Sequence, residues 1–148
     1  MSGEGRFSLV SLNASEAKGT AKSPRDFLDL VPGLGVAGDA HAAPGLRQVS
    51  LLAAEDIEGL AASGLEVSPG SFAENITTRG VDLPSLPLGA RLEIGAATLE
   101  ISQIGKDCHA GCEIRRKTGD CVMPRRGVYA TVLVGGRIVR EDNCRYRF

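Results

Sequence analysis

The most reactive side chains of this sequence are concentrated in the segment 106–114, which reads KDCHAGCEI. The thiols of Cys108 and Cys112 and the imidazole of His109 fall within five residues, and a third thiol follows at Cys121. Thiolate and imidazole groups are the ligands that zinc and softer transition metals prefer in proteins. The segment therefore predicts a metal site or a reactive thiol.

Three chemistries fit this cysteine segment, and the spacing alone does not choose among them. Zinc would use His109 and the three thiols, but Cys108 and Cys112 are further apart than the pairs of zinc knuckles, and no second pair follows. A redox disulfide between Cys108 and Cys112 lacks the strand–helix–strand setting of thioredoxin-like motifs. A single thiolate bound to a soft metal needs only one cysteine, and the neighbouring basic residues favour the thiolate form.

A glycine-rich stretch earlier in the chain, GDAH at 38–41, places one of the two histidines beside a carboxylate. In a functional site, Asp39 would orient His41, and Arg47 would bind an anion. The alternative is that Asp39 makes a turn, that His41 is solvated and that Arg47 is an ordinary charge on a strand face. These three residues are the candidates for a polar floor beside the thiol.

Several other polar residues are candidates for holding a cofactor. The side-chain amide of Asn75 offers a donor and an acceptor together, which suits the edge of a pterin or of a nucleobase, although Asn is also a frequent turn residue. Arg115 and Arg116 lie in a basic cluster that could bind phosphate through bidentate contacts. Lys18 and Lys22 lie in a loop rich in Gly, Thr and Ser and could assist, or could simply be solvated.

The elements that must position these residues are short strands. Alternating or continuous apolar runs predict strands over 5–13, 47–52, 91–94, 98–104 and 127–134. Helical spacing predicts one helix over 53–63, with Gly64 as its stop. Glycine turns predict a hairpin between 91–94 and 98–104, and another that returns the strand 127–134 into 137–140. One helix and about seven short strands predict a mainly β fold, a closed or nearly closed barrel.

Composition limits the function classes. The chain has 148 residues, of which 43% are hydrophobic, and this predicts a single domain over 1–148. A net charge of −1 gives no reason to expect a nucleic acid or an anionic membrane as partner. No apolar run is long enough to span a bilayer, and the first residues lack the pattern of a signal peptide. We therefore expect a cytoplasmic protein whose cysteines are thiols.

A set of short motifs recurs in a fixed order along almost the whole chain, from about residue 9 to about residue 139. They are GDAH at 38–41, RQVSLL at 47–52, GSFAEN at 70–75, LG at 88–89, IG at 94–95, GKDC at 105–108, MP at 123–124 and GVYA at 127–130. In this order the motifs resemble the MOSC domain family, named for the C-terminal domain of molybdenum cofactor sulfurases. The likeness is strongest to the short, stand-alone bacterial members.

The resemblance implies a β-barrel with a complex strand order that binds molybdopterin with its molybdenum ion. It also implies a cysteine that ligates the molybdenum or carries sulfur. In short members the matching position is Cys108, whereas in amidoxime-reducing relatives the context looks more like Cys112. The phosphate of the cofactor would be held by basic residues and the pterin by Asn75, with His41 and Asp39 moving protons on the open side. The basic residues are Lys18, Lys22, Arg47, Arg115 and Arg116.

The sequence departs from the family near its end. Arg140-Glu141-Asp142 stands where many members have Gly-Asp, so the final strand and any role of Asp142 are in doubt. Neither the N-terminal barrel of larger relatives nor the pyridoxal-phosphate half of the full sulfurases is present, so no pyridoxal-phosphate site is expected.

Three functions remain open. The first is a molybdenum-dependent catalyst that reduces N-hydroxylated substrates with the help of an electron-donor protein. The second is a non-catalytic carrier or insertion module that delivers sulfur or cofactor to a molybdoenzyme. The third is a zinc-stabilised barrel without catalysis.

Overall fold

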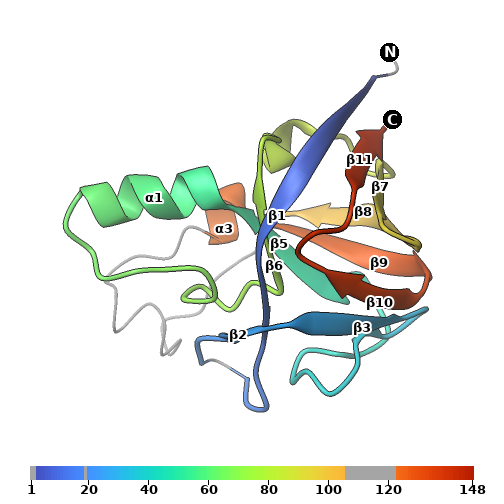
Figure 1. Ribbon diagram of the computed structural model, residues 1–148, viewed down its shortest axis with the longest axis horizontal. Helices are drawn as coiled ribbons and strands as arrows, with labels where there is room; N and C mark the ends of the chain where they lie inside the picture. The colour runs from blue at the N-terminus through green and yellow to red at the C-terminus, as the bar shows by residue number, and fades with distance from the viewer. Residues whose placement is uncertain (1–2, 19, 106–122) are drawn as a thin grey trace.

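A computed structural model describes residues 3–18, 20–105 and 123–148 of the chain (Figure 1). Most of these residues lie in strands. The elements in chain order are β1 (Glu4–Ala14), β2 (Ser23–Arg25), β3 (Phe27–Val31), β4 (Gly35–Val36), β5 (Val49–Ala53), α1 (Ala54–Ala62), β6 (Ile76–Arg79), the 3-10 helix η1 (Leu83–Ser85), β7 (Arg91–Ile94), β8 (Ala97–Ile104), α3 (Met123–Arg126), β9 (Val128–Val134), β10 (Gly136–Val139) and β11 (Cys144–Arg147).

Seven of the strands close into a barrel. They follow one another in the order β11-β7-β8-β9-β5-β6-β1, and pairing between β11 and β1 completes the ring. Each neighbouring pair is antiparallel except β5 and β6, which are parallel and are joined by the crossover that contains α1. β2 extends the sheet beyond β1 outside the ring. The predicted mainly β barrel is confirmed.

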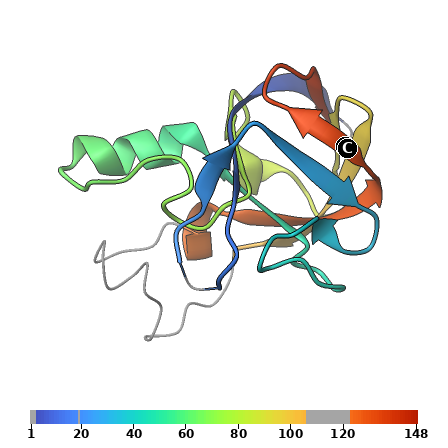
Figure 2. The same cartoon turned by 60° about the horizontal axis from the view of Figure 1, so that its bottom comes forward.

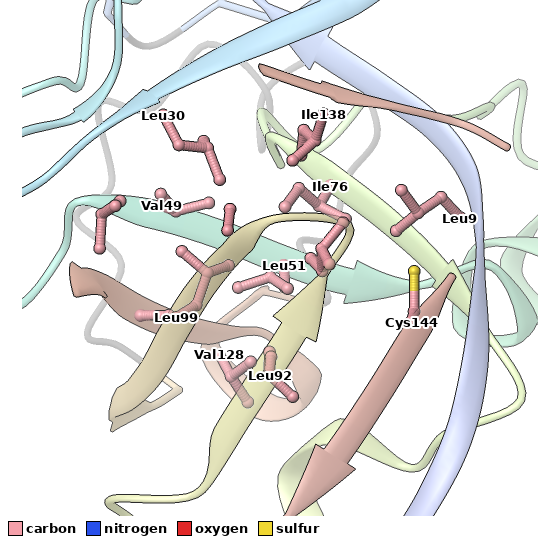
Figure 3. Close-up of a cluster of buried hydrophobic side chains, with 14 of the residues drawn as sticks. Leu9, Leu30, Val49, Leu51, Ile76, Leu92, Leu99, Val128, Ile138 and Cys144 are labelled. Atoms are coloured by element: carbon pink, nitrogen blue, oxygen red, sulfur yellow. The ribbon is translucent and has the colours of Figure 1, made fainter. Parts of the chain in front are cut away.

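The interior of the barrel is apolar because the strands alternate. In β7, Leu92 and Ile94 are buried while the residues between and before them are partly exposed, and β8 repeats the pattern with Leu99 and Ile101. Figure 3 shows Leu92 and Leu99 in the same cluster of buried side chains as Leu51 of β5. Side chains that alternate in this way place one face of each strand in the core and the other toward solvent.

A second sheet of three strands, in the order β10-β3-β4, packs against the barrel core. Leu30 of β3 and Ile138 of β10 point into the same apolar cluster as Val49 and Ile76 of the barrel wall (Figure 3). These two sheets therefore share one hydrophobic core.

The predicted hairpin between β9 and β10 is wrong. β10 pairs with β3 instead, from Gly136 opposite Leu30 to Val139 opposite Phe27. The chain leaves β9 at Gly135, where a Cβ would lie 2.5 Å from the carbonyl oxygen of Leu30. The glycine turn therefore serves a close approach to β3 and not a local return onto β9.

The helix α1 extends away from the barrel (Figures 1 and 2). Its buried Ile57 packs in a small second cluster with Leu52, Phe72 and Tyr129. This cluster covers the outer face of β5, which explains why all five residues of that strand are buried. Within the described ranges, no helix combines the length and the apolar character that crossing a membrane requires.

The last strand is formed despite the unusual residues that precede it. β11 pairs with both β1 and β7, and the carboxylate of Asp142 accepts a hydrogen bond of 2.8 Å from the backbone N–H of Val139 in the turn before it. Cys144 of β11 is 3% exposed and points into the barrel (Figure 3). Burial, with a smaller effect of Asp142, raises the pKa of this thiol to about 12, so Cys144 is a core residue.

Candidate functional site

A buried lysine organises one group of polar residues, which we call the lysine cluster (Ser15, Lys22, Asp39 and His41). The side chain of Lys22 is 0% exposed, and its Nζ lies 2.8 and 3.1 Å from the two carboxylate oxygens of Asp39. It also lies 3.1 Å from Ser15 Oγ and 2.8 Å from His41 Nδ1. The loops that follow β1 and β4 thus meet at one ammonium group.

Asp39 is the counter-ion of this ammonium. Its oxygens also accept hydrogen bonds from the backbone N–H groups of Ser15, at 2.9 Å, and His41, at 3.1 Å. Burial alone would raise the pKa of this carboxyl, but the hydrogen bonds from Lys22 and the backbone outweigh it, and the pKa is lowered. Asp39 is therefore an anion held by four donor contacts.

His41 is partly buried and stands at the border of the cluster. The sequence predicts that Asp39 orients its ring. In the structure, Asp39 accepts a hydrogen bond from the backbone N–H of His41, and the ring nitrogen Nδ1 faces Lys22. Lys22 thus stands between the carboxylate and the imidazole.

A second group of polar side chains, the amide network (Asn13, Ser50, Glu74, Asn75 and Thr77), joins β1, β5 and β6. Asn75 is 1% exposed. Its Oδ1 accepts hydrogen bonds from the backbone N–H and the hydroxyl of Ser50, at 3.0 and 3.1 Å, and its Nδ2 donates to the carbonyl of Asn13 at 3.2 Å. The amide that the sequence offers as a pterin contact is occupied in holding three strands together.

Glu74 is the acid of the amide network, and it is 0% exposed. Its Oε2 accepts hydrogen bonds from Gly70 N–H at 3.0 Å and from Thr77 Oγ1 at 2.7 Å. Its Oε1 has no hydrogen-bond partner among the described residues. Burial therefore raises the pKa of Glu74, although the hydrogen bonds partly oppose the shift.

Gly70 connects the amide network to the lysine cluster. Its N–H donates to Glu74, while its carbonyl accepts a hydrogen bond of 2.8 Å from the backbone N–H of Lys22. Gly70 has a φ of 92°, and a Cβ on it would lie 2.1 Å from the carbonyl oxygen of Lys22. Only glycine fits this left-handed, closely packed position.

Arg47 lies in the loop before β5, because the strand begins at Val49, later than predicted. Its Nε donates to Gln103 Oε1 at 3.2 Å, and its guanidinium carbon lies 5.5 Å from the centre of the Tyr129 ring. Gln103 in turn donates to the carbonyl of Gly105 at 2.8 Å. Arg47 is exposed, and its two Nη groups make no hydrogen bond within the described part of the chain.

The amide network and Arg47 lie along the same part of the barrel wall, where they are linked through the neighbouring strands β5, β9 and β8. Ser50, which contacts Asn75, is opposite Tyr129 in the β5–β9 ladder, and Tyr129 is opposite Gln103 in the β8–β9 ladder. A row of polar and aromatic residues therefore runs from Asn13, across Asn75 and Ser50, to Arg47. Lys18 is exposed in the loop after β1 and makes none of the contacts of the lysine cluster that are described above.

The remaining predicted site residues lie outside the described residues. They are the thiols and the imidazole of the cysteine segment and the arginines that follow, namely Cys108, His109, Cys112, Arg115, Arg116 and Cys121. Of the described residues that flank this segment, Gly105 contacts Gln103, which is the hydrogen-bond partner of Arg47. Gly105 follows the end of β8; its N–H donates to the carbonyl of Gly127 at 2.7 Å, and its carbonyl accepts from Gln103. On the other side of the segment, Met123 is the first residue of α3.

The structure thus defines a small closed β-barrel with buried polar groups where several loops meet. The profile of the MOSC domain family matches residues 37–145, which is most of the chain. The protein belongs to the MOSC domain family.

Solved structures of other proteins share this fold. The YuaD protein from Bacillus subtilis is 21% identical, with a TM-score of 0.82 over 99% of this chain and 98% of its own. YiiM from Geobacillus stearothermophilus is 20% identical, with a TM-score of 0.74 over 95% of this chain and 74% of its own. YiiM from Escherichia coli is also 20% identical, with a TM-score of 0.70 over 96% and 69%. No curated protein matches the sequence.

Proposed function

We propose that this MOSC protein binds the molybdenum cofactor on the surface between the exposed Arg47 and the partly buried His41 of the lysine cluster. A thiolate from Cys108 or Cys112 would act as molybdenum ligand or sulfur carrier. Membership of the family supports the cofactor class, and the thiol chemistry of the segment suits a soft metal. The proposal also includes a partner, an electron-donor protein or a molybdoenzyme that receives sulfur or cofactor.

The observation that carries the proposal is the arrangement of Arg47. Its guanidinium is held at one edge by Gln103 and over Tyr129, while the two Nη groups are turned to no described acceptor. A guanidinium fixed in this way can take two phosphate oxygens at once. The donor set therefore fits an anionic cofactor. The ammonium of Lys22 is already neutralised by Asp39, so we assign phosphate binding to Arg47, Lys18 and the arginines 115 and 116.

When bound, the cofactor would supply two-electron redox chemistry. The residues of the chain would bind it, orient it and hold protons near it. His41 stands at the border of the buried lysine cluster, where it could contact a bound group. N-hydroxylated bases and amidoximes are the substrates that we propose for a catalytic role.

The experiment is metal and pterin analysis of protein produced in a host that makes the cofactor. We expect molybdenum and pterin in the wild type, and loss of molybdenum in either Cys108→Ser or Cys112→Ser. If both single variants keep full molybdenum, neither thiolate is the ligand. Zinc in place of molybdenum, lost in Cys121→Ser, would support the zinc-stabilised barrel instead.

Arg47→Ala should lower the pterin content. Its matched control is Arg137→Ala, since Arg137 is also exposed and lies over an aromatic ring, Phe27, at 3.8 Å, but on β10. Equal loss in both variants would contradict the role of Arg47. Thiol-dependent turnover of an N-hydroxylated base with an artificial electron donor would identify a catalyst. Bound cofactor without turnover would identify a carrier.

A further inference from the structure

The contact between Lys22 and His41 determines which nitrogen of the imidazole carries the proton. A lysine ammonium has three N–H donors and no acceptor. Lys22 Nζ lies within hydrogen-bond distance of Asp39, Ser15 Oγ and His41 Nδ1, and as an ammonium it can act only as the donor in each of these contacts. The 2.8 Å contact with His41 therefore needs a lone pair on Nδ1.

The positive charge of Lys22 follows from its surroundings. The carboxylate of Asp39 is 0% exposed, and a buried carboxylate without a counter-ion is strongly unfavourable. The ammonium of Lys22 lies 2.8 Å away and is the charged hydrogen-bond donor to this carboxylate. A neutral amine on Lys22 would leave Asp39 with backbone donors as its other contacts in the cluster.

We propose that Lys22 is a positioning residue that holds His41 in its neutral form with the proton on Nε2, so that the ring donates a hydrogen bond to an acceptor atom of a bound ligand. A proton on Nδ1 would point at the ammonium, so the hydrogen bond would be replaced by repulsion between two N–H donors and, in the doubly protonated ring, also between two cations. The proton of the neutral ring must then be on Nε2. Nδ1 faces the buried ammonium, so Nε2, on the other side of the ring, is directed away from Lys22.

This assignment changes the chemistry expected of His41. A ring held in this form is a hydrogen-bond donor and not the proton acceptor that an Asp–His pair would provide. The ligands that it suits carry an oxygen acceptor, such as an oxyanion, an oxo group or a carbonyl. The identity of the ligand rests on the proposed cofactor function, whereas the proton position is a property of the chain itself.

The test is nitrogen NMR of the histidine rings at neutral pH. The chain has two histidines, so a His109→Gln variant leaves His41 as the single ring. We expect the long-range nitrogen–proton spectrum of a neutral ring with Nδ1 unprotonated and Nε2 protonated. A spectrum with Nδ1 protonated, alone or together with Nε2, overturns the proposal. The measurement needs neither a cofactor nor a substitution in the cluster.

Two variants extend the test. Lys22→Met should release the ring, giving averaged signals from both neutral forms, while the exposed arginine variant Arg79→Met should leave the spectrum unchanged. If Lys22→Met keeps the wild-type proton position, Lys22 is not the positioning group. Should that variant fail to fold, the wild-type spectrum still decides the proton position.

Metal analysis tests the hydrogen-bond donor role of His41 separately from the proposed binding of the cofactor. In protein from a cofactor-producing host, His41→Gln preserves an N–H donor near the position of Nε2, whereas His41→Leu does not. We expect molybdenum to be retained in His41→Gln and largely lost in His41→Leu. Equal retention in the two variants overturns the donor role. Absence of molybdenum from the wild type overturns the cofactor function and leaves the NMR result to decide the proton position.

Discussion

The interior of the barrel and the lysine cluster at its border are both buried, but they are built from opposite chemistry. In the barrel, residues such as Leu51, Leu99 and Ile76 are fully buried and carry no polar side-chain atom. In the cluster, Lys22 and Asp39 are equally buried and carry full charges. Apolar burial stabilises in proportion to area, whereas a buried ion pair is stable only while each charge keeps its partners. The first region therefore supports the fold, and the second fixes the position of a few atoms.

The largest effect should come from breaking the buried pair on one side. Lys22→Met leaves the carboxylate of Asp39 buried without its counter-ion, and we expect a loss of about 4 kcal/mol in the free energy of unfolding, measured by urea denaturation. The exposed pair between Arg79 and Glu58 is the control, and Arg79→Met should cost less than about 1 kcal/mol. A similar cost in both variants would mean that burial does not distinguish the two pairs.

The interior of the barrel should respond next. Leu99→Ala removes a fully buried side chain from β8 and should cost about 3 kcal/mol through lost burial and a residual cavity. Leu133→Ala is a matched control on β9, because Leu133 is 40% exposed, and it should change stability by about 0.5 kcal/mol or less. The double variant Lys22→Met/Asp39→Leu removes both charges of the buried pair. If Leu99→Ala lowers the free energy of unfolding by no more than this double variant does, the barrel interior and the lysine cluster contribute alike to stability.

The strands and the barrel class were predictable because they depend on local patterns. Alternation predicted the inward faces of β7 and β8, and Gly64 correctly marked the end of α1. The pairing of β10 with β3 was not predictable in this way. This pairing joins residues about a hundred positions apart, such as Arg137 and Asp29. A glycine turn has the same sequence whether the next strand pairs with the preceding one or with a distant one.

The sequence predicted which residues belong to the candidate site better than it predicted which of them contact one another. The sequence identifies Asp39, His41 and Lys22 as candidates. Lys22, however, lies in a polar loop of a kind that is typically solvated, and its spacing from Asp39 does not predict that the two are buried together. Ser15 and Gln103 were missed because a lone hydroxyl or amide in a loop or strand end carries no pattern. Such contacts arise only when separate loops are brought together by the barrel.

Acids in the two polar groups should differ in the pH at which they stabilise the protein. The pKa of Asp39 is lowered, so its contribution is present above the pKa of the unfolded chain and is lost as the pH falls through the folded value. The pKa of Glu74 is raised, so its contribution is present at low pH and is lost as the pH rises through the folded value.

Glu74→Gln should therefore gain stability relative to the wild type as the pH rises from 4 to 8, with an effect smaller than that of Leu99→Ala. Asp39→Asn should show the opposite trend and lose most relative to the wild type at the higher pH. Urea denaturation at several pH values measures both variants. Parallel pH profiles for wild type and Glu74→Gln would contradict the raised pKa.

The smallest effect concerns Cys144, whose thiol is buried among the apolar side chains of the barrel. With a pKa raised to about 12, the thiol is almost entirely protonated at pH 8 and is shielded by the barrel. We expect no alkylation of Cys144 by iodoacetamide in folded protein and full alkylation in urea, as measured by peptide mass spectrometry. Alkylation of Cys144 in the folded state would show that the barrel opens at β11.

The pairing of β11 between β1 and β7 also sets the order in which the molecule can be assembled. β1 precedes all the other strands of the barrel in the chain and β11 follows them, so the ring can close only when the strands between them are in place. After closure, Gly3 and Phe148 are hydrogen-bonded to each other in both directions at 2.8 Å. Residues 3 and 148 can therefore be joined by a short linker, and a circularly permuted chain of residues 3–148, opened at an exposed loop, should form the same barrel.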